Sequence, residues 1–300
     1  MRASSTGSSA GRARGPVSLG LRGTQPDPSV ASLSASPAET DPRRWWWAST
    51  RRVRLAVSGA IGITLWWVVA RLIVNNALFL PTPPQVLNEA ITIAATGELF
   101  HHVWVSTLEF ILGAVAGVAL GVLAGLPMAV NRVAFDYLDP WLSALYTTPL
   151  VALTPLFIIW FGIGLTSKVV IIFLLVMFPV TMNTIAGLRS VDEQLVNVAL
   201  SFGGTKRDVL RKVMIPWAVP FILSGARIGA GRGVVGIFVA ELFGGAGAGV
   251  GWLITAAGQV FNTALLFVGV IVLACFGLAV TSVLRVLERR IAPWRPTTTI

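Results

Sequence analysis

Long apolar runs separated by short polar segments make up most of this chain. A helix needs about 20 mainly apolar residues to cross a bilayer. Runs of this length are predicted as helices at residues 55–74, 103–130, 141–163, 168–187, 218–243 and 264–284. The pattern predicts an all-α, polytopic membrane protein with six transmembrane helices.

The basic residues are distributed unevenly between the predicted spans. If the N-terminus is cytoplasmic, the cytoplasmic segments contain nine, one, five and four Lys or Arg residues, in the order 1–54, 131–140, 188–217 and 285–300. The segments on the other side contain none, at 75–102, 164–167 and 244–263. Arg71 and Lys168 lie just inside span ends, where their head groups are expected to snorkel towards water. The positive-inside rule then predicts that both termini are cytoplasmic.

Composition narrows the possible functions. The chain is 55% hydrophobic and only 12% charged, which argues against a soluble enzyme because ordinary soluble domains are about 25% charged. The net charge of +10 comes mainly from the Lys and Arg residues of the predicted cytoplasmic segments, which is the distribution that the positive-inside rule describes. A nucleic-acid partner is therefore not expected. One cysteine and two histidines leave little for metal or redox chemistry, and we expect no metal, cofactor or catalytic residues.

Residues 1–50 are rich in Ser, Ala, Gly, Pro and Arg and are predicted to form a disordered, basic cytoplasmic tail. Trp45, Trp46 and Trp47 lie among arginines and resemble an anchor at an anionic lipid surface. The alternative is that the true start of translation lies further downstream.

Small residues and prolines predict how the spans pack. Glycine recurs every fourth residue at Gly113, Gly117, Gly121 and Gly125, and again at Gly225, Gly229 and Gly233. Small residues allow membrane helices to approach closely, so both stripes predict tight helix contacts. Pro149, Pro155 and Pro179 are expected to interrupt the third and fourth spans.

The loop at 188–217 is predicted to be a helical hairpin facing the cytoplasm. Ser190 and Glu193 have the spacing of a capping box, and Gly203 and Gly204 are expected to end this first helix. Thr205 with Asp208 predicts a second cap, Asp208 and Lys212 are placed to pair, and Pro216 is expected to end the second helix. The alternative is a solvated connection between spans.

This loop resembles the Glu-Ala-Ala signature of permease subunits of ATP-binding cassette (ABC) importers, the binding-protein-dependent inner-membrane components. The run 197–216, NVALSFGGTKRDVLRKVMIP, places at the family's spacing the residues Asn197, Ala199, Gly203, Gly204, Val213, Ile215 and Pro216. Asn197 stands where Glu is usual, which is expected to alter the contact with the partner while the hairpin keeps its shape.

Further motifs resemble the nitrate, sulfonate and taurine branch of these permeases. They include WFGIG at 160–164 with Lys168, GLRS at 187–190, and the Ala240–Glu241 pair. The resemblance implies a type I importer permease domain at 51–294, with a tail at 295–300, in a bacterial cytoplasmic membrane.

The resemblance also implies partners. Two copies of the permease would form the path, each hairpin would dock on one of two cytoplasmic ATPase subunits, and an extracytoplasmic substrate-binding protein would deliver the solute. ATP hydrolysis would belong to the ATPase, because this chain lacks a G-x-x-x-x-G-K-[ST] phosphate loop. The solute would be a small anion such as an alkanesulfonate, taurine or nitrate. A pyrimidine vitamin precursor, bicarbonate or an aromatic sulfonate remain alternatives.

Four charged residues fall within or near the spans and are candidates for the translocation path: Arg232, Glu241, Glu109 and Arg227. Arg232, near the middle of the fifth span, would set a positive field for an anion. The alternative is a structural ion pair with Glu109 or Glu241. An ion-driven transporter and a membrane enzyme are the competing classes of protein, but neither requires the hairpin motif.

Overall fold

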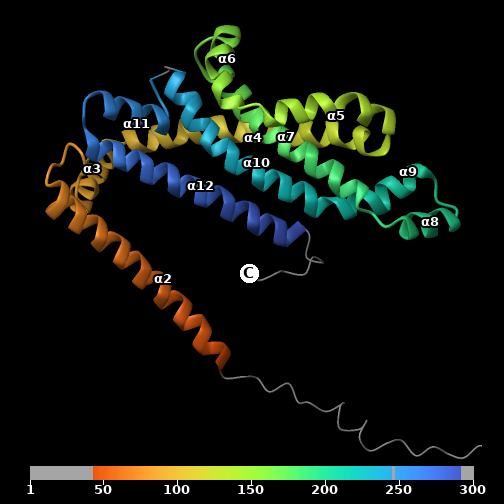
Figure 1. Cartoon of the computed structure of the whole chain (residues 1–300), viewed down its shortest axis with the longest axis horizontal. Coiled ribbons are helices and arrows are strands. Elements are labelled where there is room, and N and C mark those ends of the chain that lie inside the picture. The colour runs from red at the N-terminus through yellow and green to blue at the C-terminus, as the bar shows by residue number, and fades with distance from the viewer. Residues whose placement is uncertain (1–42, 245–246, 292–300) are drawn as a thin grey trace, which may run out of the picture. The chain divides into compact units, whose positions relative to one another are not determined.

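A computed structural model describes residues 43–244 and 247–291, with side chains from residue 53 onward. This part of the chain is helical and contains no strands (Figure 1). It divides into two units, residues 1–59 and 60–300. Within the first, helix α2 (Arg43–Val68) begins inside the range predicted as a tail. The rest of that tail, the side chains of the three tryptophans and the predicted tail at 295–300 lie outside the described residues.

The second unit contains the helices that could cross a membrane. Five are long and apolar enough: Val53–Val74, which begins in the first unit, Glu98–Val130, Leu165–Arg189, Lys206–Phe243 and Thr263–Ile291. The helices are η1 (Val69–Val74), α3 (Pro83–Ala95), α4 (Glu98–Val130), α5 (Arg132–Thr147), η2 (Leu150–Leu153), α6 (Thr154–Phe161), α7 (Leu165–Arg189), α8 (Glu193–Ser201), α9 (Lys206–Val209), η3 (Leu210–Met214), α10 (Ile215–Phe243), α11 (Val250–Gln259) and α12 (Thr263–Ile291). These elements agree with the predicted all-α membrane fold.

The third predicted span is broken. Helix α5 and the segment Leu150–Phe161 meet at an angle of 82°, and Pro149 lies at the break while Pro155 lies in the first turn of α6. Proline lacks an amide donor and disfavours helix in the residue before it, so the predicted interruption is confirmed here. The corresponding prediction for Pro179 is wrong, because α7 runs unbroken through that residue.

Helix α7 lies between α4 and α10, and both glycine stripes face it. A Cβ atom on Gly117 would lie 2.8 Å from the carbonyl oxygen of Phe173, and one on Gly225 would lie 2.9 Å from that of Pro179. Real side chains cannot be accommodated at these distances unless the helices move apart. The predicted close contacts are confirmed, and Val176 and Val180 of α7 are fully buried between the stripes.

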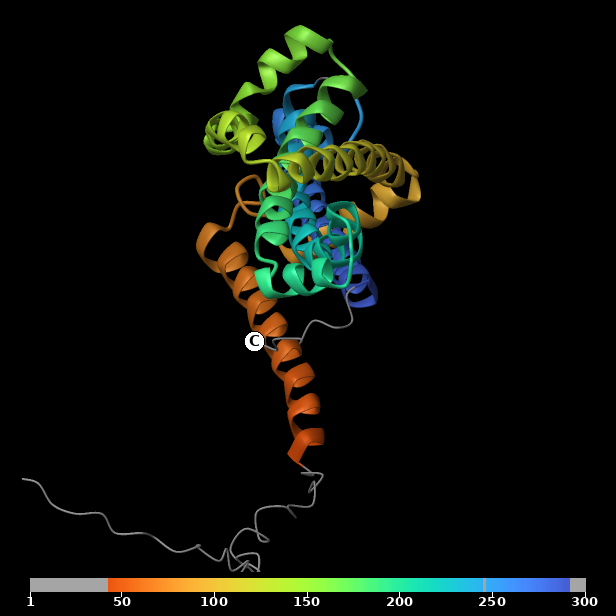
Figure 2. The ribbon, with the colours of Figure 1, turned by 90° about the vertical axis from the view of Figure 1, so that its right-hand side faces the viewer.

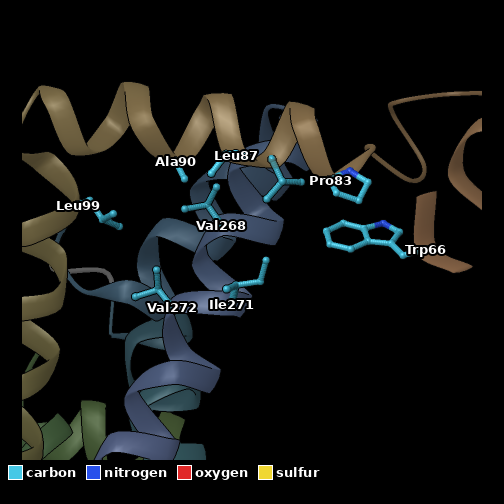
Figure 3. A pocket seen from close by; sticks show the side chains of 9 residues that line it. Trp66, Pro83, Leu87, Ala90, Leu99, Val268, Ile271 and Val272 are labelled. Carbon is cyan, nitrogen blue, oxygen red and sulfur yellow. The ribbon is translucent and has the colours of Figure 1, made fainter. Parts of the chain in front are cut away.

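An apolar pocket of about 260 Å³ lies where α3 approaches α12 (Figure 3). Trp66 closes one side: its indole N–H donates to the carbonyl of Pro81, and its ring stacks on Phe267. Helix α3 begins with a capping box between Thr82 and Gln85. These contacts fix α3 at the end of the bundle opposite to α8 and α9 (Figure 1).

Candidate functional site

The hairpin at 188–217 consists of α8, a glycine turn, and α9 followed by η3. In Figure 2 this end of the bundle faces the reader. Helix α8 starts at Glu193 with Asp192 as its N-cap, whose carboxylate accepts from the Gln194 amide at 2.8 Å. The predicted cap by Ser190 is wrong, since the Ser190 hydroxyl instead donates to the Gly187 carbonyl and accepts from the Trp217 indole. That indole contact ties the start of α10 to the end of α7.

The glycine turn has the geometry of a Schellman motif. Gly203 has φ +80° and donates to the Leu200 carbonyl, while Gly204 donates to the Ala199 carbonyl at 3.1 Å. These are the two bonds that close a helix when the residue after its C-cap is left-handed. A Cβ on Gly204 would lie 2.7 Å from the Ala199 oxygen, whereas one on Gly203 would meet open space. Both glycines and Ala199 therefore define the turn.

The second half of the hairpin is continuous with a transmembrane helix. Thr205 and Asp208 form the predicted capping box, and Lys212 pairs with Asp208 at 2.9 Å. The expectation that Pro216 ends this helix is wrong, because Lys206–Phe243 is one helical run. The π-helical segment η3, which contains Val213, precedes Ile215 and Pro216, and these two residues begin α10.

The exposed apolar face of α8 has no cover within the described chain. Phe202, at the tip, is 89% exposed, and Leu195 and Val198 are about half exposed. Asn197 is also exposed. An apolar face held in fixed shape at the end of a membrane bundle is typical of a docking surface for a protein.

Arg232 lies near the middle of α10 with its side chain exposed. Its guanidinium donates to the Tyr146 hydroxyl at 2.9 Å and lies 4.4 Å from the centre of that ring. Among the described residues, neither Glu109 nor Glu241 forms an ion pair with it. Arg227, on the same helix, pairs instead with Glu288 of α12. Arg232 thus presents a cation that is held by an aromatic ring rather than by a carboxylate.

Glu109 and Glu241 belong to a buried polar cluster at the other end of the bundle. Lys168 of α7 pairs with Glu109 of α4 at 2.8 Å, and both side chains are almost fully buried. Glu241 of α10 accepts from the Ser106 hydroxyl at 2.5 Å and from the Gly251 amide. The expectation that Lys168 snorkels to water is wrong. Sequence reasoning missed this pair because a lysine near a span end has the same pattern whether it is paired or snorkelling.

Comparison with known protein families gives a match to the family described as "binding-protein-dependent transport system inner membrane component" over residues 117–293. The matched region spans the hairpin, α10 and Arg232. The chain belongs to this family. It is therefore the permease component of an ABC importer, a transport subunit of the inner membrane and not an enzyme.

Curated relatives of the permease support this assignment along most of its length. It is 36% identical to the taurine transport system permease protein of Escherichia coli (strain K12), over 84% of this chain and 93% of the relative. It is 40% identical to a putative aliphatic sulfonates transport permease protein of Bacillus subtilis (strain 168), over 79% and 85% respectively. A formylaminopyrimidine transport permease protein of Halalkalibacterium halodurans is 32% identical over 78% of this chain and 92% of the relative.

Solved structures share the fold of the permease. A chain of an inward-facing methionine ABC transporter aligns with a TM-score of 0.59 and 16% identity, covering 66% of this chain and 98% of that one. A chain of an amino acid ABC transporter aligns with a TM-score of 0.52 and 20% identity, covering 66% and 96%. The predicted type I importer fold is confirmed.

Proposed function

We propose that this permease imports a small organic sulfonate, such as taurine or an alkanesulfonate, as one of two copies in an ATP-driven complex. Its hairpin docks on a cytoplasmic ATPase, one for each copy, and its opposite face receives solute from an extracytoplasmic binding protein. Both termini lie in the cytoplasm. The observation that carries this proposal is the hairpin, which presents an exposed apolar face on a rigid turn that continues directly into α10.

The orientation is supported by charge. The hairpin end contains Lys206, Arg207, Arg211 and Lys212, whereas residues 75–102 and 244–263 at the other end contain no Lys or Arg. Basic residues are retained on the cytoplasmic side of bacterial membranes. A hairpin on that side meets a soluble ATPase, and the opposite face meets the binding protein.

The choice of a sulfonate rests on Arg232 together with the relatives. An exposed cation in the middle of a span is costly unless it meets water or an anion, and the ring of Tyr146 holds it without neutralising its charge. A sulfonate accepts several hydrogen bonds from a guanidinium fork. Two relatives with 36% and 40% identity carry taurine and aliphatic sulfonates in their names, which favours this class over nitrate.

Co-purification tests the hairpin's part in this proposal. The permease is purified in mild detergent with the ATPase of its own organism, as wild type, Phe202→Asp, and Leu108→Asn as a matched control at an exposed apolar residue of α4 outside the hairpin. We expect the wild type and the control to retain the ATPase, and Phe202→Asp to lose at least about tenfold of it, because buried aromatic anchors dominate interface energies.

Two results would contradict the docking assignment. One is a wild-type permease that recovers no ATPase although it is folded and monodisperse. The other is a Phe202→Asp variant that retains the ATPase as well as the control does.

A further inference from the structure

The first turn of α11 is capped by side chains from two other helices. The Gly249 amide donates to Nδ1 of His102 at 3.1 Å, and the Val250 amide donates to the Ser106 hydroxyl at 2.9 Å. The Gly251 amide donates to the carboxylate of Glu241. The first amides of a helix have no partners within it, and the N-cap side chain normally supplies one. Here the N-cap is Gly249, which has no side chain, so α11 depends on α4 and α10.

Glu241 makes the most direct of these links. It lies at the C-terminal end of α10 and is 1% exposed. A carboxylate is favoured at a helix N-terminus, where the backbone dipole is positive. Gly249, at φ +114°, and Gly251 approach it so closely that a Cβ on either would overlap the carboxylate. The segment before α11 thus lies against Glu241 as closely as only glycine permits.

The charges of the cluster indicate how Glu241 works. Lys168 is paired with Glu109 at 2.8 Å. The donors that Glu241 accepts from are neutral, the Ser106 hydroxyl and the Gly251 amide, and its carboxyl group also contacts that of Glu109. A glutamine could keep the bond from the Gly251 amide to its side-chain oxygen, and its NH₂ could donate to the Ser106 oxygen, so both links would persist with the direction of the Ser106 bond reversed. An alanine could reproduce neither.

The other end of the same helix is the hairpin. Lys206–Phe243 forms a single run of 38 residues, about 57 Å long at the rise of an α-helix. Rigid helices can carry displacement from one site to another. The only parts of this path that are not α-helical backbone are the π turn η3 and the bonds from Glu241 to α11.

We propose that Glu241 is a positioning residue that ties α11 to the far end of α10, so that hairpin movement driven by the ATPase reaches the opposite face of the permease. This rests on the proposed function, which supplies the ATPase and the orientation. Ser106 is the secondary link, because it bonds both Glu241 and the Val250 amide.

A labelling experiment on the assembled transporter tests the proposal without knowledge of the solute. Cys275 is replaced by Ser, and Val260, which follows α11 and is 72% exposed, is replaced by Cys. The labelling rate of Cys at 260 by a membrane-impermeant maleimide is measured with and without ATP and vanadate. The variants added to this background are Glu241→Ala, Glu241→Gln and Ser106→Ala. Asp136→Asn, at an exposed surface ion pair, is the matched control.

We expect nucleotide to change the labelling rate about fivefold in the unaltered background, Glu241→Gln and Asp136→Asn, a size typical of coupling between sites. In Glu241→Ala the ratio of the labelling rates with and without nucleotide should fall to about one, while ATP hydrolysis continues. Ser106→Ala should give a ratio between those of Glu241→Ala and the unaltered background. If Glu241→Ala does not assemble, Ser106→Ala decides the matter.

The proposal is overturned if Glu241→Ala, or in its place Ser106→Ala, keeps the full nucleotide effect, or if Glu241→Gln loses it as completely as Glu241→Ala. It is also overturned if an active ATPase leaves labelling unchanged in the unaltered background. Failure of the proposed function is distinct, because the purified permease would then bring no ATPase with it.

Discussion

The two ends of α10 are built in opposite ways. From α8 to η3, side-chain hydrogen bonds join near neighbours, as between Thr205 and Asp208, and Phe202 is 89% exposed. At the other end, the bonds join residues far apart in sequence: Ser106 and Glu241 are 135 positions apart, and His102 and Gly249 are 147 positions apart. The side chains there are buried. The hairpin end keeps its shape through local contacts and offers an exposed surface. The buried end forms only when the helices of the bundle have packed together.

This difference separates the consequences of mutation. Damage to the hairpin should remove a partner and leave the bundle intact, because its contacts are local. Damage to the buried end should weaken the bundle itself, because unpaired buried charges and overfilled helix contacts are costly. Four predictions test the comparison, in decreasing order of expected effect.

Breaking the buried ion pair should be the most damaging. Lys168→Met leaves Glu109 buried without its partner and should destabilise the permease by about 3–5 kcal/mol. Glu109→Met added to Lys168→Met should recover most of that loss, since a well-packed apolar pair can replace a buried ion pair. Thermal unfolding in detergent measures both, and a double variant no more stable than the single one would refute this assignment.

Filling the helix contact should come next. Gly225→Val places atoms against Asn183 and the Pro179 carbonyl of α7 and should cost about 1–3 kcal/mol. Gly231→Val, on the same helix, meets nothing within 4 Å and serves as the control. The same unfolding assay should show a lower melting temperature for Gly225→Val alone, and equal melting temperatures would contradict the packing described above.

Changes in the glycine turn should act locally. Gly204→Val brings a side chain against the Ala199 carbonyl, and Gly203→Val forces a β-branched residue into a left-handed conformation at about 1–2 kcal/mol. Both should reduce ATPase binding and leave the melting temperature of the bundle unchanged. If Gly204→Val or Gly203→Val lowers the melting temperature as much as Gly225→Val does, the proposed difference between the two ends is wrong.

The exposed pair between Arg132 and Asp136 should matter least. Their side chains are 92% and 64% exposed at a separation of 3.9 Å, and such pairs contribute about 0–1 kcal/mol. Asp136→Asn should change neither melting temperature nor ATPase binding. A measurable change in melting temperature or in ATPase binding would contradict this prediction, because it would show that the exposed pair contributes to stability or to docking.

The sequence predicted those features that depend on local or periodic signals. The apolar runs predicted the spans, glycine at every fourth residue predicted the faces of α4 and α10, and Thr205 with Asp208 predicted a cap. Prediction from the sequence failed where one pattern allows two interpretations. Ser190 and Asp192 both precede α8 at capping distance, and Pro216 can end a helix or begin one.

The buried cluster lay beyond sequence reasoning for a different reason. Lys168 and Glu109 are 59 residues apart, and nothing in the local sequence of either residue indicates the other. Ser106 has no local signal at all, because its role is to cap a helix 144 residues away. Such contacts follow only from the way α4, α7 and α10 pack together.

Uptake into vesicles tests most directly the proposal that ATP hydrolysis by the partner ATPase drives an anion past Arg232 of this permease. Vesicles carrying the complete transporter are given labelled taurine with ATP, as wild type, Arg232→Lys and Arg232→Gln at equal ATPase content. We expect accumulation by the wild type, reduced accumulation by Arg232→Lys, and none by Arg232→Gln, with assembly intact in all three. Accumulation by Arg232→Gln with the affinity of the wild type would contradict it.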